Sequence, residues 1–451
     1  MDAVFLARVQ FAMTAGFHFL FPPVSIGLAW LVVILEALGW RRKSEIYQKA
    51  GKFFGKLLAL TFAVGVATGI VMEFQFGTNW SEYSKFVGDI FGAPLAAEGV
   101  FAFFLESGFL GLYLFGRNRV SKGVHWFSAL MVAFGATLSA FWIIAANSWQ
   151  QTPSGYTLNN NRAELTSFFD AVFNPSTLPR YFHTVDAALM CGAFFVTGIS
   201  AYYLLKKKHL EIAKSAMKVS IIFGLITSLL EVFPFGHTHA QQVARTQPEK
   251  FAAIEGLYST QTGAPIVLFA IPSTPPPTLK ASLEIPKLLS WMAFGDVNAK
   301  VKGINEFPKE DVPPLVMTFV SFHTMVGLGM FFIFILALAA YSMYRKNLWE
   351  NKKLLKVLLW SIPLPVIACQ VGWMAAEIGR QPWIVYKLLR TAHAASVTVS
   401  AGEILFSIIL FGIIYTALLG LYIYLLVKEV KHGPEQIEAK SHHEKLELQE
   451  A

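Results

Sequence analysis

Residues Gly92–Ser107 read GAPLAAEGVFAFFLES, an apolar stretch that carries two carboxylates and is typical of a helix that spans a membrane. Glu98 and Glu106 lie eight residues apart, which is about 12 Å along a helix axis. An ionisable group at the centre of a membrane helix costs about 2.5–3.5 kcal/mol on insertion scales, so such a group is first interpreted as functional. We interpret the two acids as steps of a proton path. The alternative is that they only make structural hydrogen bonds.

The composition of the whole chain supports a membrane protein. Of 451 residues, 55% are hydrophobic and 15% are charged, and the mean hydropathy is +0.50. A soluble domain carries about 25% charged residues. The formal net charge of +8 comes from basic residues in short loops, which is typical of membrane topology. We therefore expect the lipid bilayer as a partner and no nucleic acid.

The two cysteines carry little information about chemistry. Cys191 and Cys369 both lie in apolar segments, and neither belongs to a CxxC or CxxCH pattern. The sequence therefore predicts no zinc site, no covalently attached c-type haem and no disulfide framework.

A membrane span needs about 20 mostly apolar residues, and this rule predicts about nine spans. The predicted spans are 12–36, 56–77, 93–116, 125–147, 182–205, 217–236, 315–344, 356–378 and 402–427. Basic residues fill alternate loops, and short basic loops mark the cytoplasm. The N-terminus is therefore expected outside and the C-terminus in the cytoplasm.

This topology divides the chain into four parts. Residues 1–236 hold the first six spans, residues 237–312 form an outer loop, residues 313–432 hold the last three spans, and residues 433–451 form a charged cytoplasmic tail. Within the outer loop, IPSTPPPT (Ile271–Thr278) favours polyproline geometry, and EKFAAIEGLYS (Glu249–Ser259) favours a short helix. The seventh span is longer than a bilayer needs, so we expect it to project outside from Pro313–Pro314.

The same topology places candidate iron ligands at one depth, near the outer face. They are His18, Glu73, Glu98, His183, Met325 and Glu377. A His/Met pair suits a six-coordinate electron-transfer haem, and Arg380 can pair with haem propionates. Each residue also has an ordinary interpretation, because an interfacial histidine, a packed methionine or a Glu377–Arg380 surface ion pair would need no iron. Glu231 receives no role, and His125 is expected to be structural.

The motifs at these positions resemble subunit I of the cytochrome bd-type quinol:oxygen oxidases over nearly the full length. The matching segments are RVQFAMTAGFHFLF (Arg8–Phe21), GVATGIVMEFQFGTNW (Gly65–Trp80), GDIFGAPLAAEG and FFLES (within Gly88–Ser107), AANSW (Ala145–Trp149), FHTV (Phe182–Val185), KFAAIE (Lys250–Glu255) and GWMAAEIGRQPW (Gly372–Trp383). The resemblance implies an all-α integral membrane protein of two four-helix bundles with a peripheral ninth helix.

The resemblance also implies three haems near the outer face. His183 and Met325 match the axial ligands of a low-spin haem b, and His18 and Glu377 match those of a high-spin haem b and a haem d, without an assignment of one to the other. Trp373 matches an aromatic residue near the haems. Two departures stand out: His323 replaces an arginine of some relatives, and the outer loop, called the Q-loop in the family, is short.

For the substrates, the resemblance implies a quinol and dioxygen. Lys250 and Glu255 match quinol-binding positions, and the short Q-loop favours menaquinol over ubiquinol. Glu98 and Glu106 match proton-delivery carboxylates, with Ser107, Ser139 and Asn147 as helpers. A second subunit and sometimes a very small third one are implied as partners, in a bacterial plasma membrane.

The function we expect is that of a quinol:oxygen oxidoreductase. It oxidises quinol at the outer face and reduces dioxygen to water with cytoplasmic protons, which contributes to the proton-motive force without pumping. Two alternatives remain at this point: a proton-coupled transporter, and a b-type electron-transfer subunit without an oxygen site.

Overall fold

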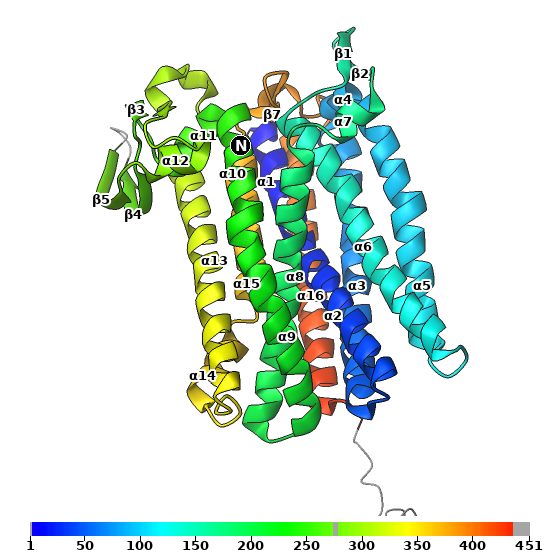
Figure 1. Cartoon of the computed structure of the whole chain (residues 1–451). Helices are drawn as coiled ribbons and strands as arrows, with labels where there is room; N and C mark the ends of the chain where they lie inside the picture. Colours follow the sequence, from blue (N-terminus) through cyan, green and yellow to red (C-terminus); the bar gives the residue numbers. More distant parts are fainter. Residues whose placement is uncertain (1, 274–277, 436–451) are drawn as a thin grey trace, which may run out of the picture.

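Long helices, nearly parallel to one another, make up most of the computed structural model, which describes residues 2–273 and 278–435 (Figure 1). Within these residues, nine helices are long and apolar enough to cross a membrane, as predicted. In chain order the spans are α1 (Ala3–His18) with α2 (Pro22–Arg41); α3 (Glu45–Thr78); α4 (Ser81–Ala97) with η1 (Glu98–Phe103) and α5 (Phe104–Phe115); α6 (Lys122–Gln151); α8 (Thr177–Lys206); α9 (Leu210–Leu230) with η2 (Glu231–Gly236) and α10 (His237–Thr246); α13 (Leu315–Tyr344); α14 (Lys352–Trp360) with α15 (Leu364–Ile378); and α16 (Ala401–His432).

The spans form two groups of four, and the ninth lies at the side. In the first group α2 packs on α3 and α6, and α4 and α5 pack on α6. In the second group α8 packs on α9 and α15, and α13 packs on α9 and α15. The two groups meet where α2 crosses α8, and α16 contacts α1 and α3. The predicted fold class, two four-helix bundles with a peripheral helix, is confirmed.

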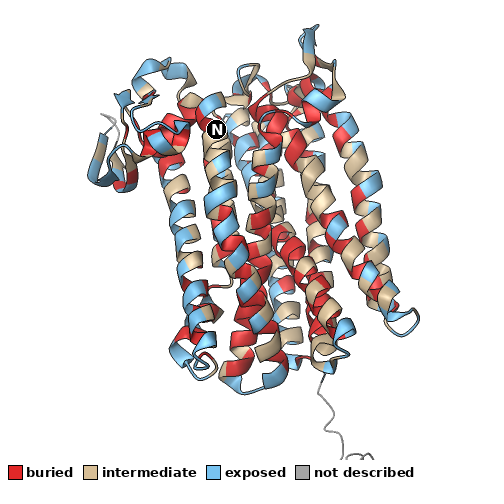
Figure 2. Cartoon of the chain, viewed as in Figure 1, coloured by how far each residue is buried: buried red, intermediate tan, exposed pale blue. Residues whose placement is uncertain are grey.

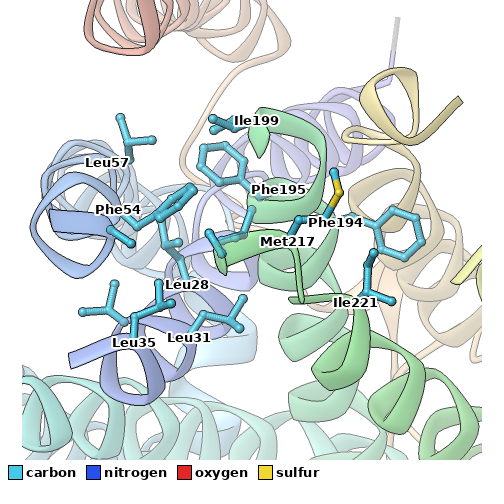
Figure 3. Packing of buried hydrophobic residues seen from close by; sticks show 14 of the residues in the cluster. Leu28, Leu31, Leu35, Phe54, Leu57, Phe194, Phe195, Ile199, Met217 and Ile221 are labelled. Carbon is cyan, nitrogen blue, oxygen red and sulfur yellow. The ribbon is translucent and has the colours of Figure 1, made fainter. Parts of the chain in front are cut away.

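The core lies where the two groups meet. Leu28, Leu31 and Leu35 of α2 pack with aromatic and aliphatic side chains of α3, α8 and α9, including Phe54, Phe194 and Met217 (Figure 3). Buried residues concentrate there, while exposed residues line the outer helix faces (Figure 2). Exposed apolar side chains are the expected surface of a chain whose solvent is lipid.

Two glycines let α2 and α8 approach closely. A Cβ atom added to Gly27 would lie 2.2 Å from the Ala188 carbonyl oxygen and 2.6 Å from the Gly192 nitrogen. A Cβ atom added to Gly192 would lie 2.2 Å from the Gly27 carbonyl carbon. Close backbone contact through small residues is the usual way in which membrane helices associate.

The first span is broken near its middle. The helix α1 ends at His18, and α2 begins with Pro22–Pro23, which suit the first turn of a helix because proline has no N–H to leave unpaired. The break places His18 at a helix end inside the bundle.

Two π-helical turns interrupt other spans. The segment η1 begins at Glu98, and η2 begins at Glu231. A π-turn holds one residue more than an α-turn and is frequent at functional sites. Both turns therefore start at a carboxylate in a span.

Short elements lie between the long helices, mostly at one end of the bundle (Figure 1). They are β1 (Tyr156–Asn159), β2 (Arg162–Leu165), α7 (Phe168–Val172), α11 (Pro248–Glu255), β3 (Gln261–Thr262), β4 (Ile266–Ser273), β5 (Thr278–Ile285), α12 (Leu288–Phe294), β6 (Lys300–Val301), η3 (Ile304–Glu306), η4 (Lys309–Asp311), β7 (Trp383–Val385), β8 (Leu389–Arg390) and η5 (Thr391–His393). Four antiparallel two-stranded sheets form among the described residues, pairing β1 with β2, β3 with β6, β4 with β5, and β7 with β8.

The outer loop differs from its prediction in detail. The sixth span continues as α10 beyond residue 236. The predicted short helix is α11, and it ends at Gly256, whose φ of 67° is positive. The proline-rich segment was expected to adopt extended polyproline geometry, but its two ends belong to a β-hairpin: Ile271–Ser273 lie in β4 and Thr278 lies in β5. Residues 274–277 lie outside the described residues. The seventh span begins at Leu315, directly after Pro313–Pro314, as predicted. Most of the predicted tail, residues 436–451, lies outside the described part of the chain.

Candidate functional site

The half-buried carboxylate of Glu377, near the end of α15, is the centre of a polar network at the end of the bundle next to α11. Its Oε1 accepts hydrogen bonds from Asn147 Nδ2 and Gln151 Nε2 of α6, each at 3.2 Å. Its Oε2 pairs with the Arg380 guanidinium. The polar end of α6 and the GRQP turn after α15 therefore hold this carboxylate in place.

Lys250 of α11 reaches the same network from the outer loop. Its Nζ donates to Gln151 Oε1 at 2.7 Å and to Gln247 Oε1 at 3.0 Å. Gln151 thus connects Lys250 to Glu377 through two successive hydrogen bonds. Burial lowers the pKa of the Lys250 amine well below its usual range, and the nearby Arg180 adds to this effect, while Glu377 opposes it.

A surplus of buried positive charge surrounds Glu377. Arg180, Arg380 and Lys250 are all at least 95% buried, and Arg180 binds the Asn147 amide oxygen. The Nε atoms of Arg180 and Arg380 are buried without a hydrogen-bond partner among the described residues. Buried cations that outnumber the carboxylate beside them are costly, so this region fits an anionic group such as the propionates of haem.

His18 is oriented by a hydroxyl of α3. Its Nδ1 lies 3.0 Å from Thr68 Oγ1, and this hydroxyl donates to the carbonyl oxygens of Val64 and Gly65. Thr68 is therefore an acceptor for His18 Nδ1–H, which leaves Nε2 as the ring nitrogen with a free lone pair. Gly69 allows the ring to pack closely, because an added Cβ atom would lie 3.1 Å from His18 Cε1. A histidine held in this tautomer is suited to bind a metal.

Glu98 and Glu106 both face α6. Ser139 Oγ donates to Glu98 Oε1 at 2.7 Å, and Glu106 packs on Gly135, where an added Cβ atom would lie 3.0 Å from Glu106 Cβ. In a regular α-helix, residues eight apart point about 80° away from each other. The extra residue of η1 offsets this rotation, so Glu98 and Glu106 point in nearly the same direction, as residues seven apart do in a regular α-helix. They then lie about two turns apart on one face of the helix. The π-turn therefore aligns the two carboxylates.

The predicted helpers of this path have different roles in the structure. Ser107 Oγ donates to the Phe103 carbonyl of its own helix at 2.7 Å, and Asn147 belongs to the Glu377 network. Ser139 alone of the three hydrogen-bonds one of the two carboxylates. Glu73 of α3 lies close enough to Glu98 for their charges to interact.

Met325 of α13 packs against Gly372 of α15, the neighbour of Trp373 in sequence. A Cβ atom added to Gly372 would lie 2.8 Å from Met325 Sδ, so a larger residue there would push the thioether aside. The Trp373 ring contacts Phe19 at the break of the first span, with 5.4 Å between ring centroids, and lies 5.6 Å from the Arg180 guanidinium.

His183, near the start of α8, is surrounded by groups that the sequence did not indicate. Its Nδ1 lies 3.0 Å from Glu231 Oε1, and its ring lies 5.1 Å from the His239 ring of α10. Asp186, one turn further along α8, is also close to Glu231. A charged residue in an apolar run was the one available signal for Glu231 and Asp186.

Glu255, the second predicted quinol residue, ends α11 next to α13. The following residue, Gly256, packs on Phe319, whose ring would lie 2.9 Å from an added Cβ atom. Burial raises the pKa of the Glu255 carboxyl to about 8. Unlike Lys250, Glu255 is not part of the Glu377 network as described above.

The turn after α15 fastens the outer loop to the spans. Tyr386 donates its hydroxyl proton to Glu249 Oε2 of α11 at 2.7 Å, and its N–H to the Gln150 carbonyl of α6. Arg390 pairs with Asp311 at 2.6 Å. His323 lies 3.0 Å from the Phe319 carbonyl through Nδ1 and 3.0 Å from the Val267 carbonyl of β4 through Nε2, so α13 also holds the hairpin.

Three residues to which the sequence assigned no chemical role have clear positions. His125 contacts the ring and carbonyl oxygen of Tyr113 near Glu36, which also binds Arg117, and this arrangement at the far end of the bundle fits the structural role expected for it. Cys191 and Cys369 are free thiols whose sulfur atoms lie 3.8 Å apart.

Comparison with known proteins identifies the family. Residues 6–434 match the family model described as cytochrome bd terminal oxidase subunit I. The chain belongs to this family. Among curated bd oxidase subunits, the chain is 43% identical to cytochrome bd ubiquinol oxidase subunit 1 of Bacillus subtilis, over 98% of this chain and 96% of that one. It is 35% identical to cytochrome bd-II ubiquinol oxidase subunit 1 of Escherichia coli, over 97% and 98%.

A solved bd oxidase has the same fold. The structure of bd oxidase from Geobacillus thermodenitrificans matches 96% of this chain and 99% of that chain with a TM-score of 0.91 and 29% identity. The chain is thus a multi-pass protein of a bacterial membrane and a haem-containing quinol:oxygen oxidoreductase of the bd family. Family membership decides in favour of the oxidase and against the transporter and the electron-transfer subunit without an oxygen site.

Proposed function

We propose that this bd oxidase subunit takes electrons from menaquinol at its outer face and reduces dioxygen with protons from the cytoplasm. The observation that carries the proposal is the buried path Lys250–Gln151–Glu377–Arg380, which links the outer-loop helix α11 to the end of α15. This path joins a predicted quinol residue to a predicted iron ligand. The short outer loop supports menaquinol as the donor by its resemblance to relatives.

Three haems are proposed for the outer half of the chain. His183 and Met325 would hold a low-spin haem b, and His18 and Glu377 would hold a high-spin haem b and a haem d, with neither assigned to a particular one. The surplus of cations around Glu377 and the free Nε2 of His18 support these positions. Bound haem would supply electron transfer and the reduction of dioxygen, and Trp373 would lie near it.

Quinol oxidation needs a proton acceptor and a group that holds the quinol oxygen. Glu255 would accept the proton, because its raised pKa of about 8 makes its carboxylate a stronger base than an exposed glutamate. Lys250 would bind a quinol oxygen. Its Nζ donates two N–H groups to Gln151 and Gln247, and its third N–H would donate to the quinol oxygen.

Proton uptake would use Glu106 and then Glu98. Their alignment by η1 along one face, against α6, supports a relay from the cytoplasmic half toward the haems. Quinol protons would leave on the outer side while protons for water enter from the cytoplasm. Charge would therefore cross the membrane without a pump.

The remaining expectations concern orientation and partners. The basic loops favour an N-terminus outside and a C-terminus in the cytoplasm, with residues 237–312 outside as the quinol-binding loop. A second subunit, and in some relatives a very small third one, would complete the oxidase.

Spectroscopy of the purified protein tests the proposal. A reduced-minus-oxidised spectrum and a carbon monoxide difference spectrum should show one low-spin and two high-spin haems. A His183→Ala variant should lose the low-spin signal and keep carbon monoxide binding. A low-spin signal that survives in this variant would refute the ligand assignment.

A further inference from the structure

Glu231 is a buried carboxylate that the proposed chemistry has not used. It is 7% exposed and lies in the apolar segment at the start of η2. Its Oε1 is 3.0 Å from His183 Nδ1, although the ring N–H does not point along the line joining the two atoms. His183 Nδ1 is buried and has no other hydrogen-bond partner among the described residues.

The π-turn explains how Glu231 comes to face His183. The segment η2 packs on α8, and it includes both Glu231 and Gly236. A Cβ atom added to Gly236 would lie 3.7 Å from His183 Cε1. The imidazole therefore lies against η2, with Glu231 at its Nδ1 side.

The contact is part of a small group of charged side chains. Arg180 acts on His183 through its charge, the His239 ring is 5.1 Å away, and Asp186 is close to Glu231. Glu231 Oε2 and Asp186 Oδ2 are buried without a hydrogen-bond partner among the described residues. Of the two acids, Glu231 is the one at hydrogen-bond distance from the imidazole.

We propose that Glu231 is a positioning residue that accepts a hydrogen bond from His183 Nδ1 and thereby tunes the low-spin haem. The inference rests on the proposed role of His183 as a residue that would hold the low-spin haem. A donor at Nδ1 fixes the tautomer that leaves Nε2 for iron, and a carboxylate partner makes the imidazole a stronger electron donor. A stronger donor stabilises ferric over ferrous iron, so the carboxylate lowers the midpoint potential.

Substitutions at two positions test this. The variants are Glu231→Gln, which keeps an acceptor without charge, Glu231→Leu, which removes both, and Asp186→Asn as the matched control for the loss of a nearby acid. The midpoint potential of the low-spin haem should shift upward in Glu231→Gln and further in Glu231→Leu, with a smaller shift in Asp186→Asn. The electron paramagnetic resonance signal of the ferric low-spin haem should change in the same order.

Each outcome is decisive. Equal shifts in Glu231→Gln and Asp186→Asn would show a through-space charge effect and overturn the hydrogen-bond role, as would unchanged potentials in both Glu231 variants. Loss of the low-spin haem alone from Glu231→Leu, with the high-spin haems retained, would support it. The His183→Ala variant separates the proposed haem ligand from the proposed role of Glu231. If the variant keeps the low-spin haem, the proposed ligand set fails. If the variant loses this haem while the Glu231 variants behave as wild type, only the role of Glu231 fails.

Discussion

Glu106 is a buried acid whose removal should affect one step of the reaction. Replacing it with glutamine keeps the packing against Gly135 but removes the ionisable proton. We expect oxygen consumption with quinol to fall by about 100-fold, because proton transfer by a positioned group contributes on that scale. The low-spin haem spectrum should stay normal.

Ser107→Ala is the matched control for this prediction. The Ser107 hydroxyl is bound to the backbone of its own helix, so its removal should leave oxygen consumption near the wild-type rate. Wild-type turnover in Glu106→Gln would remove Glu106 from the proton path.

Glu255 should give quinol oxidation a characteristic pH dependence. Its pKa is raised to about 8, so the carboxylate proposed to accept the quinol proton is scarce at neutral pH and abundant above the pKa. The rate should therefore rise as the pH increases from about 7 to 9. Glu255→Gln should be slower at every pH and lose this rise, as measured by initial rates of quinol oxidation.

Glu249→Gln is the comparison for Glu255. Its carboxylate is bound by Tyr386 and paired with Lys387, so we assign it to anchoring the loop. This variant should keep the rise in rate with pH. A pH profile that is unchanged in Glu255→Gln would contradict the role of Glu255 as the proton acceptor.

The sequence identified some residues of the candidate site and missed others. His18, Lys250 and Glu377 were predicted from motifs, and the last two come together in the structure. Arg180 was not predicted, because an arginine near a helix start looks like an interfacial residue until Asn147 and Trp373 are placed around it. Ligand roles for any of them stay predictions.

At the scale of helices, the crossing of α2 and α8 should be the least tolerant contact. An added Cβ atom on Gly27 meets backbone atoms, which cannot move aside as a side chain can. Gly27→Ala should therefore lower stability by about 1–3 kcal/mol or prevent assembly. Thermal unfolding of the purified protein, followed by haem absorbance, measures the loss.

Gly412→Ala in α16 is the control for this crossing. No atom lies within 4 Å of a Cβ atom added there, so the substitution should be neutral or slightly stabilising because alanine favours helix. If Gly27→Ala and Gly412→Ala unfold at the same temperature, α2 and α8 can move apart at their crossing without loss of stability.

Hydropathy predicted the spans well and missed their interruptions. The seventh span was predicted as 315–344 and has these bounds, because apolar length decides where a span lies. The π-turns at Glu98 and Glu231 leave no mark in hydropathy, since an extra residue changes the direction of side chains and not their polarity. The β4–β5 hairpin was missed because its prolines favour polyproline geometry locally.

For the whole molecule, the predicted orientation can be tested with exposed positions. Asp296→Cys lies in the outer loop and Lys208→Cys in the loop between α8 and α9, each in a background without Cys191 and Cys369. A membrane-impermeant thiol reagent should label position 296 in intact cells and position 208 only after permeabilisation. The reverse pattern would invert the topology and place residues 237–312, the proposed quinol-binding loop, in the cytoplasm.

The cations near Glu377 have a consequence for how the chain matures. Arg180, Arg380 and Lys250 share one region with a single glutamate ligand candidate, and two guanidinium nitrogens there lack a partner among the described residues. In a newly inserted chain, the buried positive charges would repel one another and lower stability until anionic prosthetic groups bind. Cells starved of haem precursors should accordingly degrade the subunit soon after synthesis, so cofactor supply would set its abundance.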